Sequence, residues 1–284
     1  MANKGKQIRP ILTLLSAKLF GAPKRLSTVV AAVVEMVHTA TLLHDDVADK
    51  SDTRRGALTV QKLFSPLSSV LLGDFWLARA FQLLMDYQGE SLLCYFARAI
   101  REMSEGELFQ MEKAALRNTT IAEYYQIISK KTAMLVAAGM VAGARTTGAT
   151  DKQCNIIEEI AIRLGIAFQI RDDILDYSPQ LHTGKPYGQD FLEGKMTLPL
   201  LAALEQAPQA EKRDVEMWIQ DLPSNPEQLP KIFDFVHRNK GLDFAQREVE
   251  QKECEIKTLL LQCPNNAFRI HLENVATYLS GRNT

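Results

Sequence analysis

The sequence predicts an all-α protein that forms a single large helical bundle over residues 1–284. Apolar residues recur at intervals of three and four along most of the chain, the period of a helix that buries one face. Helix-favouring residues such as Ala, Leu, Met, Glu and Gln are frequent, and the alternating patterns typical of strands are absent from the sequence. Because 46% of the 284 residues are hydrophobic, one substantial core of about ten helices is expected.

Six segments carry the helical period most clearly. They cover residues 26–44, 68–86, 90–116, 121–148, 152–177 and 197–206. Breaks that contain Gly, Pro or Ser separate the helices, as at Gly21-Ala22-Pro23 and Ser65-Pro66. Residues 133–143 are apolar around most of the helix circumference, so they are expected inside the bundle. The more charged part from Pro208 onward is expected to form peripheral helices without chemistry.

The composition argues against several classes of function. The 33 basic and 34 acidic residues nearly cancel, so charge favours neither a nucleic-acid partner nor broad attachment to a membrane. The four cysteines are scattered, which disfavours a disulfide scaffold or a zinc site. The N-terminus lacks the apolar core of a signal sequence, and no run of about 18 uninterrupted apolar residues predicts a transmembrane segment. We therefore expect a cytoplasmic protein.

Two copies of an acidic motif, DDxxD, are the most informative feature of the chain. Their aspartates are Asp45, Asp46 and Asp49 in the first copy and Asp172, Asp173 and Asp176 in the second. Residues four apart on a helix lie on one face, so each copy projects two carboxylates in one direction. Such like charges are unfavourable unless a cation lies between them, and Mg²⁺ is usually held by carboxylates together with substrate phosphates. The pair predicts two facing Mg²⁺ clusters around a phosphorylated ligand.

A single acidic cluster is most often only a solvated helix face, but two copies in apolar surroundings favour a site. Two carboxylate clusters would still repel a diphosphate unless cations balance them. Arg54 and Arg55 directly follow the first motif, and Lys131 lies within a predicted helix. Arginine offers a planar fork that suits phosphate oxygens, whereas lysine supplies a mobile point charge. These residues are therefore candidates for binding phosphate.

An ordered series of motifs then indicates a family. The series comprises GKxxRP at 5–10, HTATLLHDD at 38–46, DTRRG at 52–56, GD at 73–74, EGE at 105–107, KKT at 130–132, FQIRDD at 168–173 and GKMTLP at 194–199. On these residues the chain resembles the trans-isoprenyl diphosphate synthases, specifically the bacterial polyprenyl type that makes long all-trans chains for respiratory quinones. The resemblance implies the isoprenoid synthase fold, a helical bundle around a deep central cavity, and a homodimer.

The resemblance also implies roles for individual residues. Two Mg²⁺ ions would be held against an allylic diphosphate by Asp45, Asp46 and Asp49. A third would be held by Asp172, Asp173 and Asp176, which gives about three Mg²⁺ ions per active site. Arg54, Lys131, Gln169 and Lys185 would flank the allylic substrate, with Thr132 helping to stabilise the allylic cation. Lys6, Arg9, His38 and Arg55 would clamp the diphosphate of isopentenyl diphosphate, and Lys195 is a further substrate-binding candidate. His44 is interpreted as a structural histidine that bonds a backbone carbonyl.

The chemistry expected from this inventory is electrostatic. Metals and cations would neutralise the leaving diphosphate so that the allylic carbon–oxygen bond ionises. The expected catalytic residues are Asp45, Asp49, Lys131 and Asp172. The double bond of isopentenyl diphosphate then attacks the allylic cation, and the departing diphosphate accepts the proton that is lost. No serine or cysteine nucleophile is visible in the sequence.

Product length is expected to depend on the helix that ends in the first motif. Ala40 or Thr41, then Met36 and Val37, then Val33 would line a tunnel below the reacting carbon. In the family, a bulky aromatic residue four or five positions before the first aspartate stops growth at short products. Ala40 and Thr41 occupy those positions and are small, so the resemblance implies a long product.

The chain departs from the family at its beginning. Members usually carry several tens of residues before the GKxxRP segment, which form a first helix, whereas this sequence begins almost on that motif. Three alternatives stay open. A class I terpene cyclase would usually carry a second motif of the NSE type; a noncatalytic subunit of a heteromeric synthase would normally show eroded aspartates; and a purely structural helical protein would not bind Mg²⁺ and diphosphate together.

Overall fold

The computed structural model describes residues 7–54, 56–177 and 188–281, and nearly all of its regular elements are helices. The α-helices are α1 (Ile8–Phe20), α2 (Arg25–Ala48), α3 (Val60–Leu63), α4 (Pro66–Asp86), α5 (Leu93–Leu116), α6 (Ile121–Ile128), α7 (Met134–Thr146), α8 (Asp151–Leu175), α9 (Gln189–Leu192), α10 (Leu198–Gln206), α11 (Gln209–Asp221), α12 (Leu229–Arg238), α13 (Gly241–Leu260) and α14 (Ala267–Ser280). Short 3₁₀ turns cover Glu90–Leu92 and Pro226–Gln228. The all-α class predicted from the helical period is confirmed.

The residues gather into two compact units, each built from separate stretches of the chain. Unit 1 comprises Met1–Arg101, Leu135–Ala161 and Leu259–Leu272. Unit 2 comprises Glu102–Met134, Ile162–Thr258 and Glu273–Thr284. The first acidic motif belongs to unit 1 and the second to unit 2. The single-domain organisation stays a prediction.

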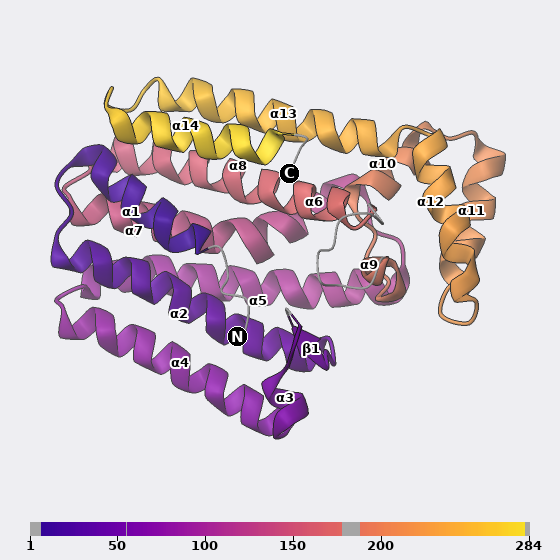
Figure 1. Ribbon diagram of the computed structural model, residues 1–284, viewed down its shortest axis with the longest axis horizontal. Coiled ribbons are helices and arrows are strands. Elements are labelled where there is room, and N and C mark those ends of the chain that lie inside the picture. The colour runs from indigo at the N-terminus through magenta and orange to yellow at the C-terminus, as the bar shows by residue number, and fades with distance from the viewer. Residues whose placement is uncertain (1–6, 55, 178–187, 282–284) are drawn as a thin grey trace. The chain divides into compact units, whose positions relative to one another are not determined.

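In unit 1, α2 lies between α1 and α4 (Figure 1). Helix α7 packs closely against α1, because a Cβ atom added at Gly143 would lie 2.4 Å from the Thr13 carbonyl oxygen. The Ser16 hydroxyl donates to the Met140 carbonyl at 2.7 Å, so a polar group of α1 is satisfied inside this contact. Almost all of α7 is buried, as its apolar circumference predicted.

In unit 2, an aromatic cluster holds the chain directly after the second motif. Tyr177 packs edge to face against Phe191 of α9 and Phe233 of α12, with ring centroids 5.4 Å and 5.1 Å apart. Helix α12 also contacts α10, and Figure 1 shows it beside α11. Arg117 donates to the carbonyls of Phe191 and Ile219, which ties the end of α5 to α9 and α11.

Two local features differ from the sequence expectations. The helix expected over 121–148 is interrupted by a π-helical turn at Ser129–Ala133, which separates α6 from α7. A small antiparallel hairpin, β1 (Thr53–Arg54) paired with β2 (Ala57–Leu58), follows α2. Strands of two residues are too short to show alternation, so periodicity could not have predicted them.

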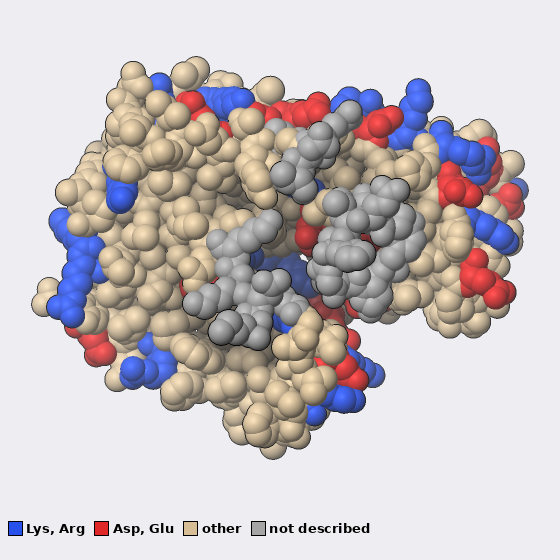
Figure 2. Space-filling view, viewed as in Figure 1, with Lys and Arg blue, Asp and Glu red and all other residues tan. Residues whose placement is uncertain are grey.

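Three helical stretches are long and apolar enough, by length and composition alone, to cross a membrane. They are Arg25–Ala48, Pro66–Asp86 and Ile121–Thr146, and their most apolar windows are 50%, 22% and 83% buried. The fold therefore buries most of the apolar window in Ile121–Thr146 and half of the one in Arg25–Ala48. On the face drawn in Figure 2, acidic and basic side chains are interspersed and neither sign dominates.

Candidate functional site

The first acidic motif lies at the C-terminal end of α2. Asp45 and Asp46 occupy the last turn, Asp49 follows as the cap, and this turn contains no basic residue. The carbonyl end of a helix carries partial negative charge, so each added carboxylate there is unfavourable by roughly 0.3–1 kcal/mol. A cation bound at this end would reverse the sign of that interaction.

The chain reverses direction directly after the motif and returns to it. Lys50 ends the helix with a positive φ of 51°, and the Ser51 amide donates to the Asp46 carbonyl at 2.9 Å. The hairpin then brings Arg54 back, and its Nε donates to Asp46 Oδ1 at 2.6 Å. The Gln61 side-chain amide also donates to the Asp46 carbonyl, at 2.5 Å.

The three aspartates of the first motif therefore differ in their surroundings. The Asp46 side chain is 6% exposed and paired with Arg54, whereas Asp45 and Asp49 are half-buried. Arg54, predicted to flank the allylic substrate, forms an ion pair with the motif itself in this structure. Asp45 and Asp49 are four residues apart, and their role as cation ligands stays a prediction.

The other predicted residues of unit 1 lie on α1 and α2, two helices in contact. Arg9 is in the first turn of α1 and His38 is in α2, and both are half-buried. The ring of His44 lies 3.2 Å from the Val70 carbonyl oxygen, as expected for a structural histidine. His44 Nε2 also lies 3.3 Å from Asp74 Oδ1 of α4.

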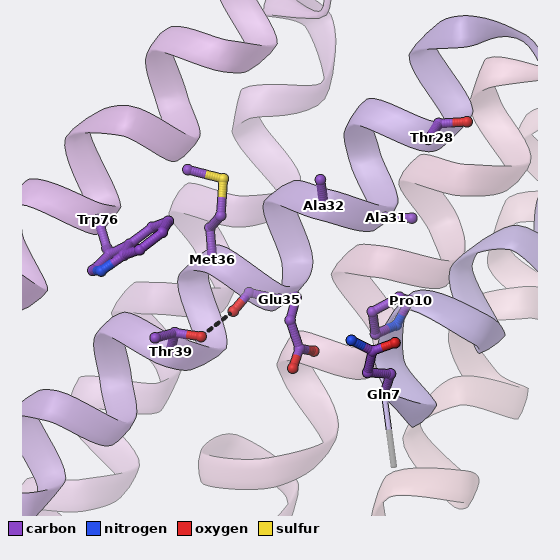
Figure 3. Close-up of a pocket in the computed structure, with 9 residues that line it drawn as sticks. All are labelled: Gln7, Pro10, Thr28, Ala31, Ala32, Glu35, Met36, Thr39 and Trp76. Carbon is purple, nitrogen blue, oxygen red and sulfur yellow. Dashed lines mark hydrogen bonds between the residues drawn. The ribbon is translucent and has the colours of Figure 1, made fainter. Parts of the chain in front are cut away.

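A groove of about 430 Å³ lies between α1, α2 and α4 in unit 1 (Figure 3). One face of α2 lines it with Thr28, Ala32, Glu35, Met36 and Thr39. Trp76 of α4 borders the groove on the side of Met36 (Figure 3). Of the residues predicted to line a product tunnel, Met36 borders this groove, whereas Val33, Val37 and Ala40 are fully buried and Thr41 is half-buried.

The second motif occupies the same position on its own helix. Asp172 and Asp173 lie in the last turn of α8, which contains no basic residue, and the Asp176 amide caps it by donating to the carbonyls of Asp172 and Asp173 at 3.2 Å. Asp172 is exposed, Asp176 is half-buried, and Asp173 is buried at 3% exposure. In both motifs, therefore, the second aspartate is the buried one.

Two protein donors occupy the carboxylate of Asp173. The Tyr124 hydroxyl of α6 donates to Oδ2 at 2.5 Å, and the Gln169 amide donates to Oδ1 at 2.9 Å. The Gln169 carbonyl oxygen in turn accepts from the Thr132 hydroxyl at 2.9 Å. Burial, reinforced by the charge of Asp173, raises the pKa of Tyr124 well above its usual value, so this hydroxyl remains a donor.

The π-helical turn presents Lys130, Lys131 and Thr132 within unit 2. Lys130 Nζ lies 2.7 Å from Glu105, and Lys131 Nζ lies 2.5 Å from Glu107, both on α5. Gly106 lies between these two glutamates, and a Cβ atom there would be 2.8 Å from the Cβ of Lys130. The segment 105–107 therefore holds the turn by two ion pairs and a close approach that only glycine allows.

Helix α8 approaches the same turn from another direction. A Cβ atom at Gly165 would lie 2.5 Å from the Cα of Ala133, so α8 packs backbone to backbone against the end of the turn. This contact aligns Gln169, one turn later on α8, with Thr132. A π-helical turn held by neighbouring elements is frequently found at functional sites.

The remaining predicted residues are placed only in part. Lys195 follows α9, and its ammonium group lies 2.5 Å from Glu193. Lys6, Arg55 and Lys185 lie outside the described residues. Tyr124 was not singled out from the sequence, because its spacing from Asp173 carries no local signal. Glu107 was named as part of the EGE motif but was assigned no role.

The carboxylates of the two motifs fit a hard cation whose coordination shell is completed by a bound substrate. Within residues 7–54, 56–177 and 188–281, no three His, Cys, Asp or Glu side chains come close enough to hold a metal alone. Mg²⁺ characteristically takes one or two carboxylates and fills its remaining positions with water and substrate phosphates. The carboxylates at the ends of α2 and α8, whose last turns contain no basic residue, match that requirement.

Comparison with known proteins gives consistent matches. The polyprenyl synthetase family matches residues 1–236. Octaprenyl diphosphate synthase of Haemophilus influenzae is 35% identical over 97% of this chain and 84% of its own length. All-trans-nonaprenyl-diphosphate synthase (geranyl-diphosphate specific) of Rhodobacter capsulatus is 37% identical over 95% of this chain and 83% of its own length.

A solved structure shows the same fold. The polyprenyl synthase of Caulobacter crescentus, complexed with calcium and isoprenyl diphosphate, superimposes with a TM-score of 0.92 at 36% identity. The match covers 99% of this chain and 86% of that protein.

Proposed function

The chain belongs to the polyprenyl synthetase family and is a trans-prenyltransferase that makes a polyprenyl diphosphate, and from this premise we propose the finer features of its reaction. It condenses isopentenyl diphosphate with an allylic diphosphate, depends on Mg²⁺, and makes a long all-trans product that serves as a quinone side chain. The observation that carries this proposal is the pair of DDxxD motifs, each at the C-terminal end of a long helix whose last turn contains no basic residue.

The helix ends account for the proposed metal dependence. Asp45 and Asp49 at α2, and Asp172 and Asp176 at α8, offer carboxylate oxygens that can receive Mg²⁺, with Asp46 and Asp173 buried behind them. Mg²⁺, when bound, neutralises the diphosphate so that the allylic carbon–oxygen bond can ionise. The polyprenyl synthase of Caulobacter crescentus was solved in complex with calcium and isoprenyl diphosphate, which supports binding of a divalent cation and a diphosphate by this fold.

The remaining residues bind and orient the substrates in this proposal. Lys131, Gln169, Arg54 and Lys185 flank the allylic diphosphate, and Lys6, Arg9, His38, Arg55 and Lys195 bind the substrate diphosphates. In the structure Lys131 is paired with Glu107 and Arg54 with Asp46, so each cation is held in place before substrate arrives. Preorganised charge of this kind stabilises a developing anion without a reorganisation cost.

The proposed product length depends on the small residues before the first motif. The positions one turn before Asp45 are Ala40, which is fully buried, and Thr41, which is half-buried, and neither side chain is aromatic. The names of the relatives include both octaprenyl and geranylgeranyl diphosphate synthases, so they do not decide the length. Replacing Ala40 by Phe should shorten the product, and reverse-phase chromatography of the dephosphorylated chains measures it. An unchanged length would contradict the tunnel assignment.

We also propose that the enzyme is a cytoplasmic homodimer. Helix α4 exposes a row of apolar side chains, Leu67, Leu71 and Phe75, at 67%, 59% and 56% exposure. Residues four apart form one ridge, and a second copy of the chain could cover it. Light scattering of the purified chain tests the mass, and a monomer at micromolar concentration would contradict the dimer.

The decisive experiment uses the purified chain with Mg²⁺, radiolabelled isopentenyl diphosphate and farnesyl diphosphate. Formation of a long, linear, dephosphorylatable product supports the proposal. A cyclic hydrocarbon would indicate terpene cyclisation instead. Turnover that requires an added partner chain would indicate a heteromeric synthase. Omission of Mg²⁺ should abolish the reaction.

A further inference from the structure

Tyr124 occupies an unusual position for a buried tyrosine. It lies on α6, 49 residues from Asp173 in the sequence, and its hydroxyl donates to Asp173 Oδ2 at 2.5 Å in a buried contact. An ionised carboxylate only accepts hydrogen bonds, so the direction of this bond is fixed. A hydrogen bond to a charged acceptor is also stronger than one between neutral groups.

The hydrogen bond from Tyr124 is the first of three in a chain, and each determines which group donates in the next. Because Asp173 only accepts, Gln169 must turn its NH₂ group toward Oδ1, at 2.9 Å. The carbonyl oxygen of Gln169 then faces Thr132 and accepts from its hydroxyl at 2.9 Å. The proton of the Thr132 hydroxyl is thereby committed to Gln169, and the hydroxyl oxygen keeps lone pairs for another partner.

Thr132 lies in the π-helical turn next to Lys131, between the close approaches of Gly106 and Gly165. The turn fixes the backbone of Thr132, but backbone position alone does not orient a hydroxyl, which rotates to suit its neighbours. The hydrogen bond to Gln169 supplies that orientation. Tyr124 is at the far end of the network, and its hydroxyl donates to Asp173, which is not one of the residues assigned to a substrate.

We propose that Tyr124 is a positioning residue, which acts through Asp173 and Gln169 to aim the Thr132 hydroxyl oxygen toward the developing allylic cation. This inference rests on the proposed function. A hydroxyl oxygen that presents lone pairs stabilises positive charge, whereas one that presents its proton does not. The assignment gives Asp173 a role as an internal acceptor, which distinguishes it from Asp172 and Asp176 in the same motif.

The neighbouring tyrosine provides a matched control. Tyr125 follows on the same helix, and its hydroxyl donates to a carboxylate at 2.6 Å, but that carboxylate is Glu248 of α13, outside both motifs. Tyr124→Phe and Tyr125→Phe therefore each remove one hydroxyl from α6 and one hydrogen-bond donor from a carboxylate. A purely structural role predicts similar effects for the two variants.

The test compares steady-state kinetics with isopentenyl and farnesyl diphosphates. Tyr124→Phe should lower kcat about tenfold, the effect of losing one charge-assisted bond, with KM for both substrates changed less than about twofold. Tyr125→Phe should stay within about twofold of wild type. Gln169→Leu should reproduce the loss of kcat, and the double variant Tyr124→Phe/Gln169→Leu should be no slower than Gln169→Leu alone, because both break one network.

A second readout does not depend on turnover. The rise in melting temperature caused by Mg²⁺ with inorganic pyrophosphate should persist in Tyr124→Phe, since Asp172 and Asp176 are unchanged. Loss of that rise, equal kcat losses in the two tyrosine variants, or multiplying losses in the double variant would each overturn the inference. If Tyr124→Phe does not fold, Gln169→Leu with normal kcat overturns it. Inactivity of the wild type with every allylic primer would instead overturn the proposed function.

Discussion

The two acidic motifs share one pattern and one place on a helix, yet they are supported in different ways. The buried aspartate of the first motif pairs with Arg54, eight residues later, through a hairpin that follows the helix directly. The buried aspartate of the second motif depends on Tyr124, 49 residues earlier, and through Gln169 it reaches the π-helical turn. The first motif is therefore a local structure, whereas the second depends on the packing of three separate elements in unit 2.

The comparison also shows what the motifs have in common. Each long helix ends in carboxylates without a basic residue in its last turn, against the preference of the helix dipole. Each motif buries its second aspartate and leaves the first more accessible. The shared part is the part proposed to bind a cation, and the difference lies in which residues hold the buried aspartate.

The largest expected effect comes from the accessible aspartates. Asp45→Asn and Asp172→Asn should each lower prenyl transfer by at least about 100-fold, because each removes a charge that stabilises the bound cation. Without metal, each variant also removes a charge from the carbonyl end of a helix, which by itself favours folding by roughly 0.3–1 kcal/mol. Product formation measures the first effect, and thermal melting without Mg²⁺ measures the second.

Asp86 provides the control for this pair. It is exposed at the C-terminal end of α4 and lies outside both motifs. Asp86→Asn should give the same small gain in stability with unchanged turnover. A marked loss of stability in Asp45→Asn without metal would show that this carboxylate supports the fold and would contradict the electrostatic account.

A smaller effect should separate the two modes of support. A Cβ atom at Gly165 meets the backbone of Ala133 at 2.5 Å, whereas one at Gly73 meets the imidazole of His44 at 2.2 Å. Backbone cannot move aside as a ring can, so Gly165→Ala should cost about 1–3 kcal/mol of unfolding free energy and Gly73→Ala less. Urea denaturation measures both variants. Equal losses would mean that the second motif depends on packing no more than the first.

The smallest effect is a pH dependence at the start of α6, the helix that carries Tyr124. A hydrogen bond from Lys113, aided by the Thr120 amide, lowers the pKa of Glu123 from 4.5 to about 2. A lowered pKa gives stability that is present above about pH 4.5 and is lost as the pH falls toward about 2. Glu123→Gln, which keeps the cap, should melt below wild type at pH 7, and the gap should close across that window.

Lys113→Met should show the same pH dependence, because it removes the other partner of the pair, whose atoms lie 2.6 Å apart. Thermal melting between pH 7 and pH 3 measures both variants. A gap between Glu123→Gln and wild type that stays constant over this range would exclude the ion pair as its cause.

The sequence by itself determined the fold class and the acidic motifs. Helical periodicity is a local property, so the helices around Asp45 and Asp172 could be predicted from the residues near each motif. The two copies of DDxxD indicated cation chemistry because residues four apart share a helix face. The helix boundary predicted at Ser65-Pro66 is also confirmed, since the Ser65 hydroxyl caps α4 by accepting a hydrogen bond from the Ser68 amide.

Only the tertiary structure decided which aspartate of each motif is buried and what holds it there. Tyr124 has no sequence spacing that relates it to Asp173, and Gly106 and Gly165 gain their meaning from elements that pack against them. The π-helical turn at Ser129–Ala133 lies in a segment whose periodicity predicts an uninterrupted helix. Local patterns report how a residue repeats along its own helix, whereas close packing and long-range hydrogen bonds depend on partners that sequence neighbours do not reveal.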